Sequence, residues 1–390
     1  MAVPTRADLT ARLGRLRQRI TDEGLGGLVV THLPNIAYLT GFWASTGSLV
    51  VKPDGCVLIT DGRYRTMASE LVASGRGPAD TSLRVVERSH EETLARTLAE
   101  AGDVRLGFEA AHLSVRTHQH LQQALAEGAW PRGEVPTLVA TFRLVEQVRA
   151  VKDDLEIDTL RDAARLLSSL EGQVRALVGA GREERQVAAE IDAVVRRAGF
   201  ERPAFDTIVA SGPNSALPHA RPGARCLSVG DIVLLDFGGV YGGYCVDLSR
   251  VATIGPPGPD ARRLHAAVIE AQRAAISVIR PGVWASDVDG AARRVLAGCG
   301  LGDAFSHGTG HGLGLEIHEE PRVGKRDPDR TRAAAAGADG PLAPGMIFTV
   351  EPGAYAPGLG GVRIEDDVLV TADGCEVLTG MSREIWVQDA

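Results

Sequence analysis

Apolar positions in the first 141 residues switch repeatedly between helical and strand spacing. A helix that ends at Gly24, with Thr5 and Asp8 as its N-terminal cap, is predicted from the spacing of Leu9, Leu13, Leu16 and Ile20. Further helices are expected near 91–101 and 114–127, and strands at 28–31, 48–51, 56–60, 104–108 and 137–141. Lys52-Pro-Asp-Gly55 suits a hairpin turn. This alternation predicts a small α/β domain.

The pattern changes after residue 148, where we place a boundary between domains 1–148 and 149–390. One long amphipathic helix is predicted over 155–178, after the charged run 149–154. Further helices are expected near 184–198, 258–279 and 286–298, and strands at 205–211, 231–237, 244–254, 346–351, 361–371 and 375–378. Strands and helices come in runs, which predicts an α+β domain. The Ala- and Gly-rich stretch Lys325–Pro344 is expected to be a mobile surface insertion.

Composition narrows the classes of function. The 390 residues are 44% hydrophobic and 24% charged, and the net charge of −8 provides no basic surface for nucleic acid or an anionic membrane. The five cysteines lack Cys-x-x-Cys spacing, which suits neither a disulfide framework nor a zinc knot. Residues 1–24 lack the apolar core of a signal peptide. We therefore expect a cytoplasmic protein with reduced thiols.

The segment 234–247 carries the first candidate chemistry. An apolar strand ends in glycine-rich turn residues and returns as a second strand. A turn centred near 241–242 would place Asp236 and Asp247 opposite each other on one face. The plain alternative is a solvent-facing pair on an edge hairpin. Because Asp236 follows the buried-strand run 232–235, where an unpaired carboxylate is costly, a bound cation is favoured instead.

Three histidines follow within twelve residues, at His307, His311 and His318. The first two have the spacing of a helical metal pair, but the intervening Gly-Thr-Gly makes a helix implausible. A glycine-rich loop that brings imidazoles close to a ligand is expected instead. One such histidine alone is more often structural, and the clustering favours a functional role.

Two late carboxylates, Glu351 and Glu365, complete the set of candidate ligands. Each glutamate taken alone is an ordinary charged residue. The strand period of two places Arg363 and Glu365 on one face, with Val362 and Ile364 on the other.

These motifs, in this order over roughly 200–380, resemble the creatinase/aminopeptidase P/methionine aminopeptidase family. The segments 35–42 and 58–64 are similar to that family's non-catalytic N-terminal domain. The resemblance implies a pita-bread catalytic domain, a creatinase-like α/β domain before it, and two divalent ions held by Asp236, Asp247, His311, Glu351 and Glu365. In the family pattern Asp247 and Glu365 bridge the ions, Asp236 chelates one, and His311 with Glu351 holds the other. Four carboxylates balance two divalent cations, which can share and acidify a water.

The resemblance also implies roles around the ions. It makes His219 a further active-site histidine, His318 a donor to the substrate carbonyl and the oxyanion, His307 part of a proline pocket, and Arg363 a partner that orients a ligand carboxylate. Glu351 is also expected to move a proton to the departing nitrogen. The ligand set suits manganese, with cobalt and zinc as alternatives. A homodimer is expected, since relatives with this N-terminal domain are usually dimers.

Proline-containing peptides are the expected substrates, because the N-terminal domain argues against a methionine aminopeptidase. We expect an Xaa-Pro aminopeptidase. An Xaa-Pro dipeptidase is the alternative: it must capture a free carboxylate, most simply with an arginine. The segment 333–344 contains no arginine, although Arg326, Arg330 and Arg332 lie just before it. A nonenzymatic peptide-binding relative is a remote alternative, because such relatives lack the full ligand set.

Overall fold

The computed structural model describes residues 3–100, 104–128, 135–329 and 339–389. The chain forms two compact units, residues 3–149 and residues 150–390. None of the helices in these described ranges is long and apolar enough to cross a membrane.

The N-terminal unit is built on a six-stranded sheet in the order β4-β3-β2-β1-β5-β6. Strands β1, β2 and β3 pair antiparallel, and β3–β4, β1–β5 and β5–β6 pair parallel. The strands are β1 (Gly27–Val30), β2 (Ser48–Lys52), β3 (Gly55–Thr60), β4 (Thr81–Val85), β5 (Arg105–Glu109) and β6 (Thr137–Thr141). All the strands predicted in this half are present, and the Lys52–Gly55 pair closes the predicted hairpin.

Helices of this unit include the predicted α1, whose Thr5 and Asp8 cap each other's backbone N–H groups. The helices are α1 (Arg6–Asp22), α2 (Leu33–Thr40), α3 (Arg65–Ala73), α4 (His90–Ala99), α5 (Val115–Glu127) and α6 (Leu144–Arg149). Leucines of α4 and α5 pack against one face of the sheet and form the core there. The sequence analysis missed α2, α3 and α6, which are short, and the edge strand β4.

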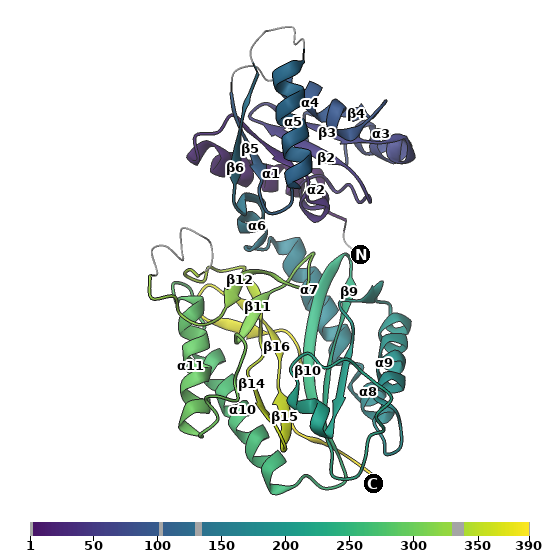
Figure 1. Cartoon of the computed structure of the whole chain (residues 1–390), viewed down its shortest axis with the longest axis vertical. Coiled ribbons are helices and arrows are strands. Elements are labelled where there is room, and N and C mark those ends of the chain that lie inside the picture. Colours follow the sequence, from purple (N-terminus) through teal and green to yellow (C-terminus); the bar gives the residue numbers. More distant parts are fainter. Residues whose placement is uncertain (1–2, 101–103, 129–134, 330–338, 390) are drawn as a thin grey trace. The chain divides into compact units, whose positions relative to one another are not determined.

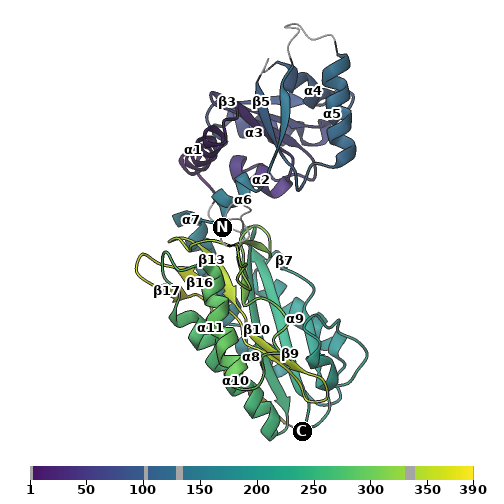
Figure 2. The same cartoon turned by 60° about the vertical axis from the view of Figure 1, so that its left-hand side comes forward.

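The C-terminal unit places curved strands between two groups of helices (Figures 1 and 2). Helices α10 (Pro259–Ser277) and α11 (Ala285–Gly298) lie on one side, and α8 (Glu171–Leu177) and α9 (Glu184–Ala198) lie on the other. One sheet has the order β18-β10-β9-β7, with β8 also pairing to β9, and a second has the order β12-β11-β13-β16-β17. Strands β14 and β15 form a separate hairpin.

The strands of this unit are β7 (Arg202–Pro203), β8 (Ile208–Ser211), β9 (Ile232–Tyr241), β10 (Tyr244–Ile254), β11 (Gly310–Gly312), β12 (Glu319–Val323), β13 (Ile347–Val350), β14 (Gly353–Ala356), β15 (Gly360–Arg363), β16 (Asp366–Val370), β17 (Cys375–Val377) and β18 (Trp386–Gln388). The α+β prediction is therefore confirmed. Residues 330–338 of the predicted insertion lie outside the described residues.

Two predicted elements of this unit are each divided in two. The single helix predicted over 155–178 is wrong: α7 (Asp154–Ser168) ends and α8 begins at Glu171. The Ser169 N–H still bonds to the carbonyl four residues back, but the Leu170 N–H bonds to Leu167, three residues back, so the α-helical pattern is interrupted there. The predicted strand 361–371 is interrupted between β15 and β16, where backbone N–H groups bond to Pro352 and Ser249 instead of a ladder partner.

The β9–β10 hairpin has a different register from the predicted one. Tyr241 pairs with Tyr244, so the turn lies at Gly242–Gly243, whose φ angles of 62° and 84° need glycine. Asp236 therefore lies opposite Ser249, and Asp247 lies opposite Gly238. The prediction that the two aspartates lie directly opposite each other is wrong by two residues. A shift of two keeps both side chains on one face, because the strand period is two.

Candidate metal centre

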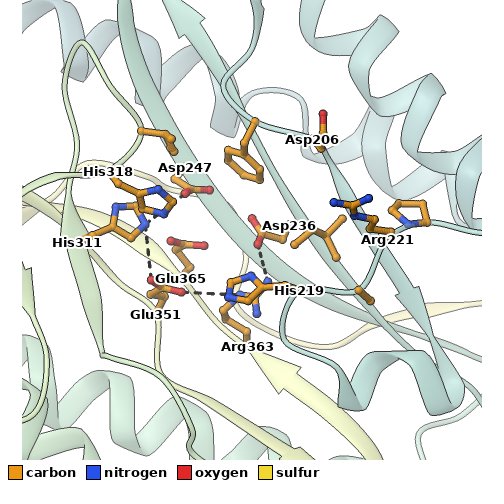
Figure 3. Close-up of a pocket in the computed structure, with 15 residues that line it drawn as sticks. Asp206, His219, Arg221, Asp236, Asp247, His311, His318, Glu351, Arg363 and Glu365 are labelled. Carbon is orange, nitrogen blue, oxygen red and sulfur yellow. Dashed lines mark hydrogen bonds and ion pairs between the residues drawn. The ribbon is translucent and has the colours of Figure 1, made fainter. Parts of the chain in front are cut away.

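The structure brings the predicted site residues of the C-terminal unit to one place (Figure 3). One pocket is lined by His219, Asp236, Asp247, His311, His318, Glu351, Arg363 and Glu365. An adjoining pocket shares His219, His311, His318, Glu351 and Arg363, and adds His307. The two form arms on either side of a common centre. One arm has the apolar side chains Phe205, Ile208 and Ile317 in its wall. The other runs past His307 to Arg322.

Four parts of the fold deliver the candidate ligands to this centre. The β9–β10 hairpin supplies the aspartates and β11 supplies His311, while Glu351 directly follows β13 and Glu365 lies two residues after the end of β15. The interruption after β15 places Glu365 where its N–H and C=O bond to Ser249 and Arg250 of β10. Val362 and Ile364 were predicted to point away from Arg363 and Glu365, and both are buried in the hydrophobic core.

The ligand atoms lie close to one another. Single ligand atoms of Asp247, His311 and Glu365 all lie within 4.8 Å of each other. His311 Nε2 is 3.6 Å from Glu351 Oε1 and 3.9 Å from Asp247 Oδ2. Asp236 Oδ1 and Glu365 Oε1 are buried and accept no hydrogen bond within the described part of the chain. Buried acceptors without a donor are costly, so these oxygens indicate a missing positive partner.

Burial and mutual repulsion change the proton affinity of the cluster. The pKa values of Asp247 and Glu365 are raised well above their usual range, first by burial and then by neighbouring carboxylates. Burial raises the pKa of Glu351 to about 8, although Arg363 opposes the shift. Burial lowers the pKa of His311 to about 3, which keeps its ring neutral and able to bind a metal. Divalent cations fit this set of residues, because they would neutralise the carboxylates and occupy the free acceptors.

The raised carboxyl pKa values predict how the stability of the metal-free protein depends on pH. Above about pH 4.5 the unfolded chain has released protons that the folded carboxyls keep, so stability falls as the pH rises towards the Glu351 pKa of about 8. Protein from which metal has been removed with a chelator should therefore melt at progressively lower temperature as the pH rises from 5 to about 8. The rise in melting temperature on adding Mn²⁺ should grow over the same range. A metal-free protein that is most stable near pH 8 would contradict the assignment.

The predicted histidines surround the ligands. The rings of His311 and His318 meet edge to face with centroids 4.3 Å apart. Burial lowers the pKa values of His318 and His307, the latter to about 4, so both rings are neutral at physiological pH. His307 Nε2 lies 2.9 Å from the hydroxyl of Tyr355. His219 lines both arms of the site.

Arg363 ties the ligands to the arm that contains His307. Its buried guanidinium donates to Asp236 Oδ2 at 2.5 Å, to the Ser249 hydroxyl at 2.9 Å and to the Tyr355 hydroxyl at 2.6 Å. The Ser249 hydroxyl in turn donates to Glu365 Oε2 at 2.7 Å. One arginine thus orients two of the candidate ligand carboxylates, one directly and one through a serine.

Sequence reasoning missed three residues of this site. Ser249 carried a usable signal, because it lies two residues after Asp247 and the strand period of two places both on one face. Tyr355 and Arg322 carried none, since their positions depend on the β14–β15 hairpin and on the pairing of β12 with β11, where Arg322 lies opposite His311.

A buried group of four carboxylates and a neutral imidazole, flanked by further histidines, defines the class of metal-dependent enzymes. Comparison with known proteins identifies the family. Residues 158–372 match the model of metallopeptidase family M24, and residues 12–151 match the creatinase/prolidase N-terminal domain. The chain belongs to metallopeptidase family M24. Its C-terminal unit has the pita-bread fold, as predicted.

Relatives of the whole chain support this conclusion. The chain is 38% identical over 374 residues to the Xaa-Pro dipeptidase of Pyrococcus furiosus, covering 96% of this chain and 99% of that one. The structure of the Xaa-Pro dipeptidase from Bacillus anthracis matches with a TM-score of 0.87 at 32% identity, covering 97% of this chain and 100% of that one. The X-Pro aminopeptidase from Thermotoga maritima matches with a TM-score of 0.80 at 31% identity, covering 96% and 100%.

Proposed function

We propose that this metallopeptidase cleaves the peptide bond before proline and prefers Xaa-Pro dipeptides. The observation that carries the dipeptide preference is Arg322 on β12. Its exposed side chain lines the same arm of the site as His307, and it makes no hydrogen bond or ion pair with any described residue. A dipeptide presents a free carboxylate directly after proline, and a guanidinium binds a carboxylate with charge-assisted hydrogen bonds.

The other arginine in this arm is not available for the substrate. Arg363 is buried and its donors are used by Asp236, Ser249, Tyr355 and the carbonyl of Pro218. Among the described residues that line this arm, Arg322 is therefore the cation left to bind a substrate carboxylate. The names of the Pyrococcus and Bacillus relatives agree with a dipeptidase.

This proposal departs from the aminopeptidase expected from the sequence. That expectation depended on the absence of an arginine in 333–344, whereas Arg322 precedes this segment and reaches the site from the strand beside His311. Of the three arginines considered for the same task, Arg326 is exposed and does not line this arm, and Arg330 and Arg332 lie outside the described residues. The aminopeptidase remains the second candidate, because the Thermotoga maritima relative carries that name. The complete ligand set disfavours a nonenzymatic peptide-binding protein.

The residues around the centre suit hydrolysis of a tertiary amide. Proline has no amide hydrogen, so its nitrogen must receive a proton as it leaves. We assign that transfer to Glu351, whose carboxylate lies at the centre of the cluster, 3.6 Å from His311 Nε2. His318, with a neutral ring, donates a hydrogen bond to the attacked carbonyl oxygen. His307, held by the Tyr355 hydroxyl, forms the wall against the pyrrolidine ring, and His219 completes the active site beside the scissile bond.

Two divalent ions are proposed as the resident cofactor, held by Asp236, Asp247, His311, Glu351 and Glu365. When bound, they supply Lewis-acid polarisation and lower the pKa of water. The oxygen-rich ligand set favours manganese over cobalt or zinc. A cytoplasmic homodimer stays a prediction from the sequence.

The deciding experiment compares kcat/KM for Leu-Pro and Leu-Pro-Gly. The dipeptide should be preferred by roughly tenfold or more, and Arg322→Ala should lower its kcat/KM roughly 10- to 100-fold, the scale of a lost charged hydrogen bond. The tripeptide should be nearly unaffected by this change. Arg326→Ala, which removes an exposed arginine outside the pocket, is the matched control. A wild-type preference for the tripeptide would establish the aminopeptidase instead.

A further inference from the structure

A buried ion pair lies beneath the loop that carries His318. Lys152 Nζ is 3.5 Å from Glu319 Oε2, and the two side chains are only 1% and 5% exposed. Lys152 is one of three lysines in a chain with 42 lysines and arginines. Removing two charges from water costs several kcal/mol per ion unless their geometry compensates, so the pair needs an explanation beyond stability.

Lys152 is held at the start of the C-terminal unit. Its backbone N–H donates to the carbonyl of Gly345 at 2.9 Å, and the preceding Val151 pairs with Met346 just before β13. These backbone contacts fix the residue from which the side chain extends. Among the described residues, Glu319 is the one hydrogen-bonding partner of the Lys152 ammonium.

Glu319 closes the loop 312–319 from the inside. Its Oε1 accepts from the backbone N–H of Glu316 at 3.0 Å, and Gly312 pairs with Glu319 itself. The carboxylate lies directly against Gly314, where a Cβ atom would come within 2.7 Å of both oxygens. The Gly314 carbonyl accepts from the N–H of Cys245, two residues before Asp247. The loop is therefore wrapped around the carboxylate and tied to the metal-centre strand.

We propose that Lys152 is a positioning residue for His318. Its ammonium holds the Glu319 carboxylate inside the loop, and the carboxylate holds the backbone on either side of His318. Without the ammonium, the buried carboxylate would lose this counter-charge and would turn towards water, and His318 would move with it. The inference rests on the role proposed for His318 in hydrolysis.

The test measures kcat, KM and bound metal for Lys152→Met, with the exposed Lys325→Met as the matched control for loss of a lysine charge. Lys152→Met should lower kcat roughly 10- to 100-fold, the usual scale for loss of a supporting contact, while KM and metal content stay nearly unchanged. Lys325→Met should match the wild type. Adding Glu319→Gln to Lys152→Met should restore most of the lost kcat, because the buried negative charge that Lys152 balances is then removed as well.

The pathway through His318 is tested by repeating the change in a His318→Ala background, where Lys152→Met should cause no further loss of kcat. An unchanged kcat in Lys152→Met, a loss of equal size without His318, or loss of metal would each overturn the proposal. If Lys152→Met does not fold, the single substitution Glu319→Gln provides the same test. It should lower kcat in the otherwise wild-type protein and cause no further loss in the His318→Ala background. A full kcat in His318→Ala would instead overturn the role of His318 in the proposed function.

Discussion

Asp247→Asn should abolish measurable peptidase activity and lower metal affinity by more than about 100-fold, because even residues that only support a ligand cost 10- to 100-fold. Asp247 is buried on β10, and its carboxylate lies among the ligand atoms of His311 and Glu365. The substitution removes a negative charge from the centre of the cluster while keeping the shape of the side chain. The measurements are hydrolysis of Leu-Pro and metal content after dialysis against Mn²⁺.

Unfolding can be separated from loss of metal in this variant. Burial and the neighbouring carboxylates raise the pKa of Asp247 well above its usual range, so burial disfavours its charge in the metal-free protein, and an amide has nearly the same shape as the carboxyl. The metal-free variant should therefore melt close to the metal-free wild type, but without the increase on adding Mn²⁺. The exposed Asp260→Asn in helix α10 should behave as wild type. Full metal content in Asp247→Asn would contradict its assignment as a ligand.

His318→Ala should keep near-normal metal content and lose kcat by roughly 100-fold or more, the scale of removing one oxyanion donor. The rings of His318 and His311 meet edge to face, and both histidines line the two arms of the site. His318 is the more exposed of the two. We therefore assign His318 to the substrate and His311 to the metal.

The matched comparison is His311→Ala, which should lose metal and activity together. Both substitutions remove one neutral imidazole from the same pair of rings, so the difference in bound metal isolates their roles. Loss of metal in His318→Ala would show that the role assigned to it is wrong. The two histidines differ by seven residues in the chain, and only the fold of the loop 312–319 separates their tasks.

Much of the secondary structure could be predicted because it depends on local patterns. The capping residues of α1, the Lys52–Gly55 hairpin and the helical spacing in α9, α10 and α11 each involve residues that are neighbours in the chain. The errors in secondary structure occurred where contacts with residues distant in the sequence determine where an element ends. The long helix after residue 155 ends early, and the strand after 361 is interrupted because Glu365 bonds to Ser249 across the site.

The hairpin shows how close a sequence argument comes. Its glycines correctly indicated a turn, and the period of two correctly placed Asp236 and Asp247 on one face. The register was wrong because Gly242 and Gly243 both adopt positive φ, which places the turn one residue further along. That shift sets Ser249, not Asp247, opposite Asp236, where the serine hydroxyl links Arg363 to Glu365.

The sequence by itself determined the fold class, the family and the set of candidate ligands, because residue types in a particular order are visible without coordinates. Only the tertiary structure decided which neighbours act on those ligands. Arg322 reaches the His307 arm through strand pairing, and Lys152 meets Glu319 across 167 positions of chain. Such contacts depend on how strands and loops pack against one another, and they cannot be predicted from the local spacing of residues.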